Sequence, residues 1–242
     1  MDLGVNHIDT AEFYGNGVVN SMINKVLKTN TNIFLASKIG ADPNPNGKIP
    51  IKLAQRPEDL RKSIENNLRS LGLDAGPSMV SPEGNQVVDI DDQMATMIDF
   101  RNEGKIGAIG LSGVTLDVFK RAVPAEIAAV QNVYSLISRE FERLLVACSD
   151  HKVAWIPFFP FGGNVPGWPK VSEHQEVIKI AQRLSLTPSQ VGLSWLLQHA
   201  PNIFLIPETA NIEHLQENIN VSSIVLDDTA IANLNDLAGI SN

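Results

Sequence analysis

The chain has 242 residues, of which 43% are hydrophobic and 19% are charged, as in ordinary globular proteins with one large domain or two small ones. Its formal net charge of −8 argues against nucleic acid or an anionic membrane surface as the main partner. A lone cysteine, Cys148, excludes a disulfide framework and a thiolate zinc site.

The start of the chain has no basic segment followed by an apolar one, so it predicts no signal peptide. The apolar runs are shorter than the about 20 residues that span a bilayer. Together with the single cysteine, these features predict a cytoplasmic protein that does not insert into a membrane.

The first half of the chain alternates apolar strands with amphipathic helices. Short segments rich in apolar residues predict strands over residues 5–9, 33–38 and 106–111. Apolar residues at helical spacing predict helices over residues 18–27, 57–71, 90–101 and 115–122. Residues 40–56 are rich in Pro, Asn and Gly and predict a long loop.

The stretch 73–84 stands where this rhythm requires a further strand. It holds one pair of adjacent large apolar residues, Met79 and Val80, with Pro and Gly on both sides. Because proline cannot donate to a strand ladder, we expect irregular backbone here or at most a stub of a strand.

The second half continues the alternation. Strands are predicted over residues 127–130, 153–158 and 203–206. Helices are predicted over residues 138–149, 172–184, 188–199, 211–220 and 228–237. A second long loop, over residues 159–170, contains several Pro and Gly.

Strands that are apolar throughout and alternate with helices indicate a parallel sheet buried on both faces. A doubly wound sheet would also explain this alternation. A closed TIM (β/α)8 barrel explains in addition why polar residues follow the strands, because all strand ends then share the face where the active site is built. With no internal repeat and no linker, we expect residues 1–242 to form a single barrel domain. The polar residues are Asp9, Lys38, Ser112, Gln131, Asn132 and Thr209.

Asp9, Tyr14 and Lys38 form a combination that supports proton transfer. Asp9 and Lys38 end neighbouring predicted strands, and Tyr14 lies in the loop after Asp9. A lysine ammonium and a buried carboxylate beside a phenol prepare it to donate a proton. Taken singly, Asp9 also fits a turn cap, and Tyr14 fits a packed aromatic side chain.

The opening motif, Gly4 with Asp9-Thr10-Ala11 and Tyr14-Gly15, resembles the opening signature of the aldo-keto reductases. Further matches follow in the family's order and cover nearly the whole chain. They are Lys38, Ile109-Gly110-Leu111-Ser112, Gln131-Asn132, Trp155-Ile156-Pro157-Phe158, and Ile206-Pro207-Glu208-Thr209 followed by His214, Glu217 and Asn218.

This resemblance implies a TIM barrel that binds a nicotinamide dinucleotide across its C-terminal face. It implies hydride transfer between NAD(P)H and an aldehyde or ketone, with NADP(H) as the expected cofactor and NAD(H) as the alternative. By resemblance, Tyr14 is the general acid that protonates the carbonyl oxygen, and Lys38 and Asp9 assist it.

The remaining matched residues are implied to bind the cofactor. Around the nicotinamide, Ser112, Gln131 and Asn132 would hold the carboxamide, and Trp155 would stack on the ring. Pro157 and Phe158 would lie beside it. At the adenosine and its phosphate, the expected contacts are Thr209, His214, Glu217 and Asn218.

The chain departs from the family pattern in four ways. The family's catalytic His is missing, since no His occurs between His7 and His151, and Ser81 is the nearest positional match. The first strand and most of the first helix are expected to be absent, which with the degraded fourth strand gives an incomplete barrel with an open seam. Glu208 stands where NADPH-dependent members carry a base, and a carboxylate there would repel a 2′-phosphate. Ile156 replaces a common Ser.

Three functions fit these observations to different degrees. The leading hypothesis is an active NAD(P)H-dependent oxidoreductase that acts on a small carbonyl compound. The alternative is a non-catalytic, decayed relative that keeps the barrel scaffold and cofactor binding. A TIM-barrel isomerase or lyase is disfavoured, because the chain lacks metal and phosphate signatures, and no metal is expected.

The other titratable residues are given structural interpretations. We expect His7 to be a hydrogen-bonded core histidine, because it shares a strand face with Asp9. His174 and His199 are expected on helix surfaces, and Cys148 as a small buried residue. The sequence indicates neither the substrate nor the oligomeric state.

Overall fold

The computed structural model describes residues 3–29, 32–44, 46, 51–73, 78–80, 88–163 and 167–237. The chain divides into two compact units, Met1–Val130 and Gln131–Asn242, and each is described by itself. That residues 1–242 form a single domain therefore stays a prediction.

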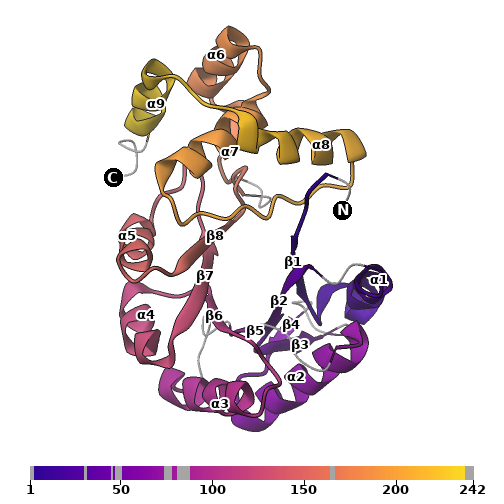
Figure 1. Ribbon diagram of the computed structural model, residues 1–242. Coiled ribbons are helices and arrows are strands. Elements are labelled where there is room, and N and C mark those ends of the chain that lie inside the picture. Colours follow the sequence, from indigo (N-terminus) through magenta and orange to yellow (C-terminus); the bar gives the residue numbers. More distant parts are fainter. Residues whose placement is uncertain are drawn as a thin grey trace. The chain divides into compact units, whose positions relative to one another are not determined.

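The first unit is a parallel sheet with helices on its outer side (Figure 1). Its strands are β1 (His7–Ala11), β2 (Phe34–Ile39), β5 (Ser78–Val80), β6 (Ile109–Ser112) and the start of β7 (Ile127–Val133). Its helices are α1 (Val18–Leu27), α2 (Pro57–Leu71), α3 (Ile90–Asn102) and α4 (Leu116–Ala122). The short 3-10 turns are η1 (Tyr14–Gly17) and η2 (Val123–Ala125).

The register of the sheet fixes where the catalytic candidates Asp9 and Lys38 lie relative to each other along the strands. Strands β1 and β2 pair in parallel with Ala11 opposite Lys38, so Lys38 lies two residues beyond Asp9 along the sheet. The three-residue strand β5 pairs with β2 on one side and β6 on the other, with Met79 opposite Lys38 and Gly110. The predicted stub of a strand is confirmed.

Local sequence signals explain where the helices begin. Pro57 occupies the first turn of α2, with Glu58 and Asp59 beside it, where acids interact well with the helix dipole. Helix α2 ends at Gly72, whose φ of 67° is left-handed and favours glycine. Asp89 caps α3 by accepting a hydrogen bond from the Asp91 backbone N–H.

The second unit contains the end of β7, the adjacent strand β8 and most of the later helices. Strand β8 covers Ala154–Phe158. The helices are α5 (Glu142–Asp150), α6 (Gln175–Leu184), α7 (Pro188–His199), α8 (Ile212–Asn220) and α9 (Asp228–Asn235). The 3-10 turns are η3 (Val171–Glu173) and η4 (Val221–Ser223). Tyr134, Trp155 and Trp195 are fully buried in its core.

Four sequence predictions are wrong in detail, two in the second unit and two in the first. The expected strand over 203–206 is reduced to one bridge between Ile203 and Trp155, because Pro207 has no N–H to continue a ladder. The helix expected from residue 138 begins at Glu142, because Ser135 and Ser138 exchange two backbone hydrogen bonds in a tight turn.

The predicted loop 40–56 contains an antiparallel hairpin, formed by β3 (Ala41–Pro43) and β4 (Ile51–Leu53). Strand β1 begins and ends two residues later than expected, so Asp9 lies in its middle rather than at its end. Residues 74–77 and 81–87, with Ser81 among them, lie outside the described residues.

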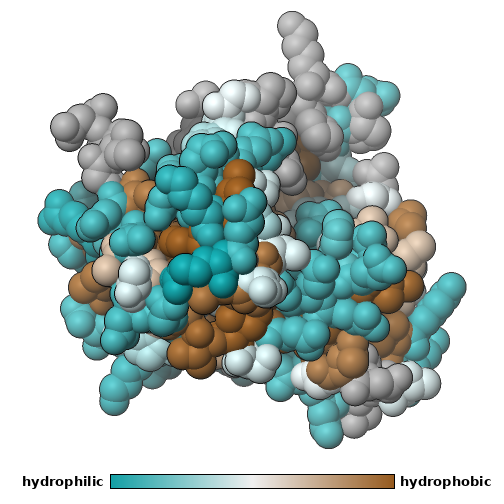
Figure 2. Space-filling model, turned by 90° about the horizontal axis from the view of Figure 1, so that it is seen from above, coloured by the Kyte–Doolittle hydropathy of each residue, from teal (hydrophilic) through white to brown (hydrophobic). Residues whose placement is uncertain are grey.

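The surface mixes hydrophilic and hydrophobic residues (Figure 2). Val18, Met22 and Val26 of α1 are four residues apart and exposed, so they form one apolar stripe. Within the part of the chain that the structure describes, no helix is long and apolar enough to cross a membrane.

Candidate active site

The first unit contains an ion pair between Asp9 of β1 and Lys38 of β2. The Lys38 ammonium donates a hydrogen bond to Asp9 Oδ1, and only 11% and 10% of the Lys38 and Asp9 side chains are exposed. Because charges are costly to bury alone, each of these groups compensates the other. The strand register accounts for the contact, since a long lysine side chain spans the offset of two residues.

Tyr14 joins this pair from the turn η1 that follows β1. The Lys38 Nζ lies 5.1 Å from the centroid of the Tyr14 ring, which is a cation–π contact. The ring also packs edge-on against Phe13, and 38% of Tyr14 stays exposed. The structure thus brings the three predicted catalytic residues together, with the tyrosine as the member that solvent and ligands reach.

On the helix side of β1 and β2 lies a set of hydrogen-bonded side chains that we call the polar cluster. Its members are Thr10, Glu12, Asn20, Ser37, Asn67 and Ser70. Thr10 and Ser37 are the chain neighbours of Asp9 and Lys38, so strand alternation turns them toward the opposite face. The Thr10 hydroxyl donates to Asn20 Oδ1 at 2.8 Å, and the Ser37 hydroxyl donates to Asn67 Oδ1.

The cluster links both strands to both neighbouring helices. The Asn20 amide of α1 donates to Asn67 Oδ1 of α2 at 3.2 Å and to Glu12 Oε2 at 2.7 Å. Thr10, Asn20, Ser37 and Asn67 are each at most 3% exposed. The sequence does not predict this cluster, because its hydrogen bonds join side chains from segments that are far apart in the chain.

His7 lies on the same strand as Asp9 and is half-buried. Its ring packs edge-on against Phe34, with 5.4 Å between the centroids. Burial lowers the pKa of His7. Its buried Nε2 has no hydrogen-bond partner in the described part of the chain, so the expectation of a hydrogen-bonded core histidine is wrong at this atom.

The predicted nicotinamide-binding residues are largely buried. Ser112, at the end of β6 in the first unit, is 7% exposed. In the second unit, Gln131 and Asn132 of β7 are 1% and 0% exposed. Their polar side chains at strand ends suit the recognition of an amide, because each side-chain amide offers both a donor and an acceptor.

Trp155 is fully buried on β8. It meets Tyr134 edge-on at 5.8 Å between centroids, and its buried indole Nε1 lacks a hydrogen-bond partner among the described residues. Pro157 is buried and Phe158 is half-buried. Stacking of Trp155 on a nicotinamide ring requires this covered face to open, and it stays a prediction.

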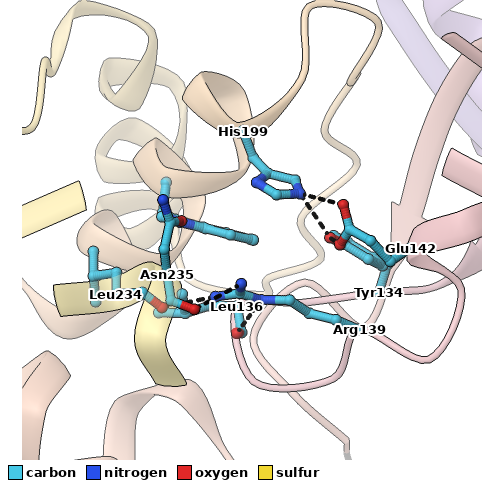
Figure 3. A network of polar contacts seen from close by, with 8 residues as sticks. Tyr134, Leu136, Arg139, Glu142, His199, Leu234 and Asn235 are labelled. Atoms are coloured by element: carbon cyan, nitrogen blue, oxygen red, sulfur yellow. Dashed lines mark hydrogen bonds and ion pairs between the residues drawn. The ribbon is translucent and has the colours of Figure 1, made fainter. Parts of the chain in front are cut away.

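A network of polar contacts anchors the segment that follows Gln131 and Asn132 (Figure 3). The Tyr134 hydroxyl donates to Glu142 Oε2, and His199 Nε2 lies 2.8 Å from Glu142 Oε1 and 3.0 Å from the Tyr134 oxygen. Burial raises the pKa of Tyr134. Burial also opposes the charge of Glu142, but the hydrogen bonds from His199 and Tyr134 outweigh this effect and lower the pKa of Glu142.

His199 and His174 therefore differ from the helix-surface residues that the sequence suggested. The His199 side chain is 19% exposed and stacks on Trp195, with 4.3 Å between ring centroids. The half-buried His174 caps α6, because its Nδ1 accepts a hydrogen bond from the Glu176 N–H at 3.3 Å. Cys148 is buried as expected, and burial raises its pKa to about 12.

A cavity of about 350 Å³ lies in the second unit and will be called the adenosine cavity. It is lined by the four residues that the resemblance assigned to the adenosine end of a cofactor and by four others. The eight residues are Phe161, Thr187, Ser189, Glu208, Thr209, His214, Glu217 and Asn218. The volume falls within the range of small-molecule sites, and the lining offers hydroxyl, amide and carboxylate groups.

The first turn of α8 beside this cavity is capped by the chain itself. Asn211 Oδ1 accepts hydrogen bonds from the backbone N–H groups of Glu213 at 2.7 Å and His214 at 3.4 Å. The Thr209 hydroxyl accepts one from the Asn211 N–H at 3.1 Å. Three backbone donors at the start of this helix therefore already have partners within the chain.

The sequence does not predict cofactor contacts for Phe161, Thr187 or Ser189, whereas it places Glu208 where a carboxylate would repel a 2′-phosphate. Phe161 lies in the second long loop, and Thr187 and Ser189 lie at the start of α7, whose capping box Thr187 forms with Gln190. Helix capping already accounts for Thr187, and no sequence motif singles out Phe161 or Ser189, so only the folded structure adds these residues to the cavity. Among the described residues, no group of three or more His, Cys, Asp or Glu side chains could hold a metal ion.

Comparison with known proteins identifies the family. The model of the Aldo/keto reductase family matches residues 1–238. Pyridoxine 4-dehydrogenase of Escherichia coli (strain K12) is 34% identical over 247 residues, which cover 98% of this chain and 84% of that protein.

Solved structures agree with this match. A thermostable aldo-keto reductase crystallised with the inhibitor epalrestat has a TM-score of 0.83 at 27% identity, covering 98% of this chain and 83% of that one. An aldo/keto reductase of Klebsiella pneumoniae, solved with NADP and acetate, has a TM-score of 0.81 at 25% identity, covering 98% and 81%. The fold is the α/β TIM barrel of these enzymes. The chain therefore belongs to the aldo/keto reductase family.

Proposed function

We propose that this chain is an NAD(P)H-dependent oxidoreductase that transfers a hydride between the cofactor and the carbonyl group of a small aldehyde or ketone. The observation that carries this proposal is the contact of Asp9, Lys38 and Tyr14 in the first unit. Family membership supports a common reaction for these three side chains.

In this proposal Tyr14 donates its hydroxyl proton to the carbonyl oxygen as that oxygen gains negative charge. The Lys38 ammonium beside the ring stabilises the phenolate that remains, since it is a positive charge 5.1 Å from the ring centroid. Asp9 holds Lys38 in place through their ion pair. In the reverse direction the phenolate accepts the proton of an alcohol.

The adenosine cavity fits the nucleoside half of a dinucleotide in volume and in lining. Thr209, His214, Glu217 and Asn218 would hold the adenosine end. Ser112, Gln131 and Asn132 would orient the carboxamide, and Trp155, Pro157 and Phe158 would contact the ring. When bound, the nicotinamide supplies or accepts the hydride, and NADP(H) and NAD(H) are both candidates.

The name of the Escherichia coli relative makes pyridoxine and its 4-aldehyde the first substrates to test. No nucleic acid or membrane partner is proposed. Two expectations stay predictions: that the compartment is the cytoplasm, and that the barrel lacks its first strand and most of its first helix. They do not enter the chemistry of Tyr14.

Two measurements test the proposal. The purified chain is titrated with NADPH and with NADH, following tryptophan fluorescence and the heat of binding, and turnover of the pyridoxine 4-aldehyde and an aromatic aldehyde is then recorded. Binding with turnover supports the proposal, and Tyr14→Phe should abolish turnover while leaving cofactor affinity nearly unchanged. Binding without turnover of any aldehyde would favour the non-catalytic alternative. A folded protein that binds neither cofactor would contradict the proposal.

A further inference from the structure

We infer that the adenosine cavity selects a cofactor with a free 2′-hydroxyl, so that this chain prefers NAD(H) to NADP(H); the inference rests on the proposed function. The cavity's described lining includes two carboxylates, of Glu208 and Glu217, and neither a lysine nor an arginine. A 2′-phosphate would add about two negative charges beside them.

The two possible cofactors differ only in what they present to these carboxylates. A ribose 2′-hydroxyl can donate a hydrogen bond to a carboxylate, and acidic residues recognise NAD in this way in dinucleotide-binding sites. A 2′-phosphate offers acceptors only, and it requires arginine, lysine or free backbone N–H donors. Glu208 and Glu217 have no ion-pair partner within the described residues, so no neighbouring cation cancels their charge.

The start of α8 does not supply the missing donors. A helix N-terminus binds phosphate through its first N–H groups. Here the N–H groups of Glu213 and His214 are bonded to the Asn211 side chain, and that of Asn211 is bonded to the Thr209 hydroxyl. A phosphate at this place would have to break these bonds and approach Glu208 as well.

His214 is the one residue of the described lining that can carry a positive charge. The two carboxylates outnumber this single basic group, so they decide the preference. We expect NADH to bind at least tenfold more tightly than NADPH, which corresponds to about 1.4 kcal/mol.

The test is a calorimetric titration of the full chain with NADH and NADPH at pH 8. Glu208→Gln should raise NADPH affinity about three- to tenfold and change NADH affinity by less than threefold. Glu208→Arg should make NADPH the tighter ligand. The matched control is Glu213→Gln, which removes an exposed carboxylate at the start of α8, outside the cavity lining. This change should alter the NADPH affinity by less than twofold.

Salt provides a readout that a merely structural role of Glu208 would not produce. The preference of the natural chain for NADH should shrink between about 20 mM and 500 mM salt, because ions screen the repulsion of the phosphate. Equal or tighter binding of NADPH by the natural chain at low salt would overturn the inference while leaving the proposed function intact. Failure of a folded chain to bind either dinucleotide would contradict the proposed function and this inference with it.

Discussion

The catalytic candidates Asp9, Tyr14 and Lys38, which we call the catalytic corner, differ from the adenosine cavity in how their charges are balanced. In the first unit, Asp9 and Lys38 neutralise each other in an ion pair that is about nine-tenths buried, above the closed polar cluster. In the second unit, Glu208 is exposed, Glu217 is half-buried, and both line an open cavity without an ion-pair partner in the described structure. We therefore expect the catalytic candidates Asp9 and Lys38 to contribute to the stability of the fold, and we expect the cavity residues to tolerate substitution at little structural cost.

The largest effect is expected from Lys38→Met. This change leaves the Asp9 carboxylate buried without the ammonium that balances its charge, so the free energy of unfolding should fall by about 3 kcal/mol. Urea denaturation of both proteins measures it. The double variant with Asp9→Asn should regain part of the loss because it buries no charge. If Lys38→Met were as stable as the natural chain, the catalytic corner would have no structural role.

A second large effect is expected in the polar cluster. Asn67→Ala removes the acceptor of Ser37 and Asn20 and the donor to the Ser63 carbonyl, so buried groups lose their partners. The loss should be about 2 kcal/mol by the same denaturation method. Asn66→Ala is the matched control, since this neighbour on α2 accepts a hydrogen bond from Arg69 at the surface, and it should cost less than about 0.5 kcal/mol. Similar losses in both variants would exclude a special role for the cluster.

In the second unit, Tyr134→Phe should lower the free energy of unfolding by about 1 kcal/mol. This effect is smaller because Glu142 is partly solvated and keeps its contact with His199. The lowered pKa of Glu142 sets the pH range: this stabilisation is complete above about pH 4.5 and is lost as the pH falls through the lower pKa of the folded state. Denaturation of the natural chain and of the variant at pH 7 and at pH 3 measures the difference in their free energies of unfolding at each pH. A difference that stayed constant across this range would show that the hydroxyl does not act through the Glu142 charge.

His7→Phe should stabilise the chain more in acid than above neutral pH. Burial lowers the pKa of His7, so below about pH 6.5 the unfolded chain binds a proton that the folded chain does not, and stability falls as the pH decreases. The variant removes this loss and keeps a ring against Phe34. Thermal unfolding should show a gain of up to about 1 kcal/mol at pH 5 and a smaller one at pH 8. A gain that is larger at pH 8 would contradict this interpretation.

The smallest effect on stability is expected for Glu208→Gln. Its side chain is exposed and makes no ion pair among the described residues, so the free energy of unfolding should change by less than about 0.5 kcal/mol. Calorimetric unfolding of the same sample used for cofactor titration provides the value. A loss above about 2 kcal/mol would mean that the cavity lining supports the fold, which would remove the contrast between the two regions.

The proximity of Asp9 and Lys38 could be predicted from the sequence, because neighbouring parallel strands run in the same direction and the opening motif resembles that of a known family. Their catalytic role stays a prediction. The position of this contact along the strands was less predictable, since β1 begins and ends two residues later than expected. The stub at β5 was predictable, because Pro and Gly limit a strand locally.

Other features depend on contacts between distant segments. Asn20 and Asn67 are polar residues on helices, and each became a core residue only through the other. His199 ends a helix and was expected on the surface, but Trp195 covers one face of its ring and Glu142 meets its Nε2. Hairpin β3–β4 arises in a Pro- and Gly-rich segment whose short strands carry no periodic signal.

Transfer of deuterium tests the central claim most directly. NADH or NADPH in which deuterium replaces both hydrogens at C4 of the nicotinamide is mixed with an aldehyde, and the alcohol product is examined by mass spectrometry. We predict that the deuterium appears on the former carbonyl carbon, and that Tyr14→Phe slows this transfer about 10²- to 10⁴-fold without weakening cofactor binding. Product without deuterium from the cofactor, or transfer at an unchanged rate in Tyr14→Phe, would contradict the proposed reaction.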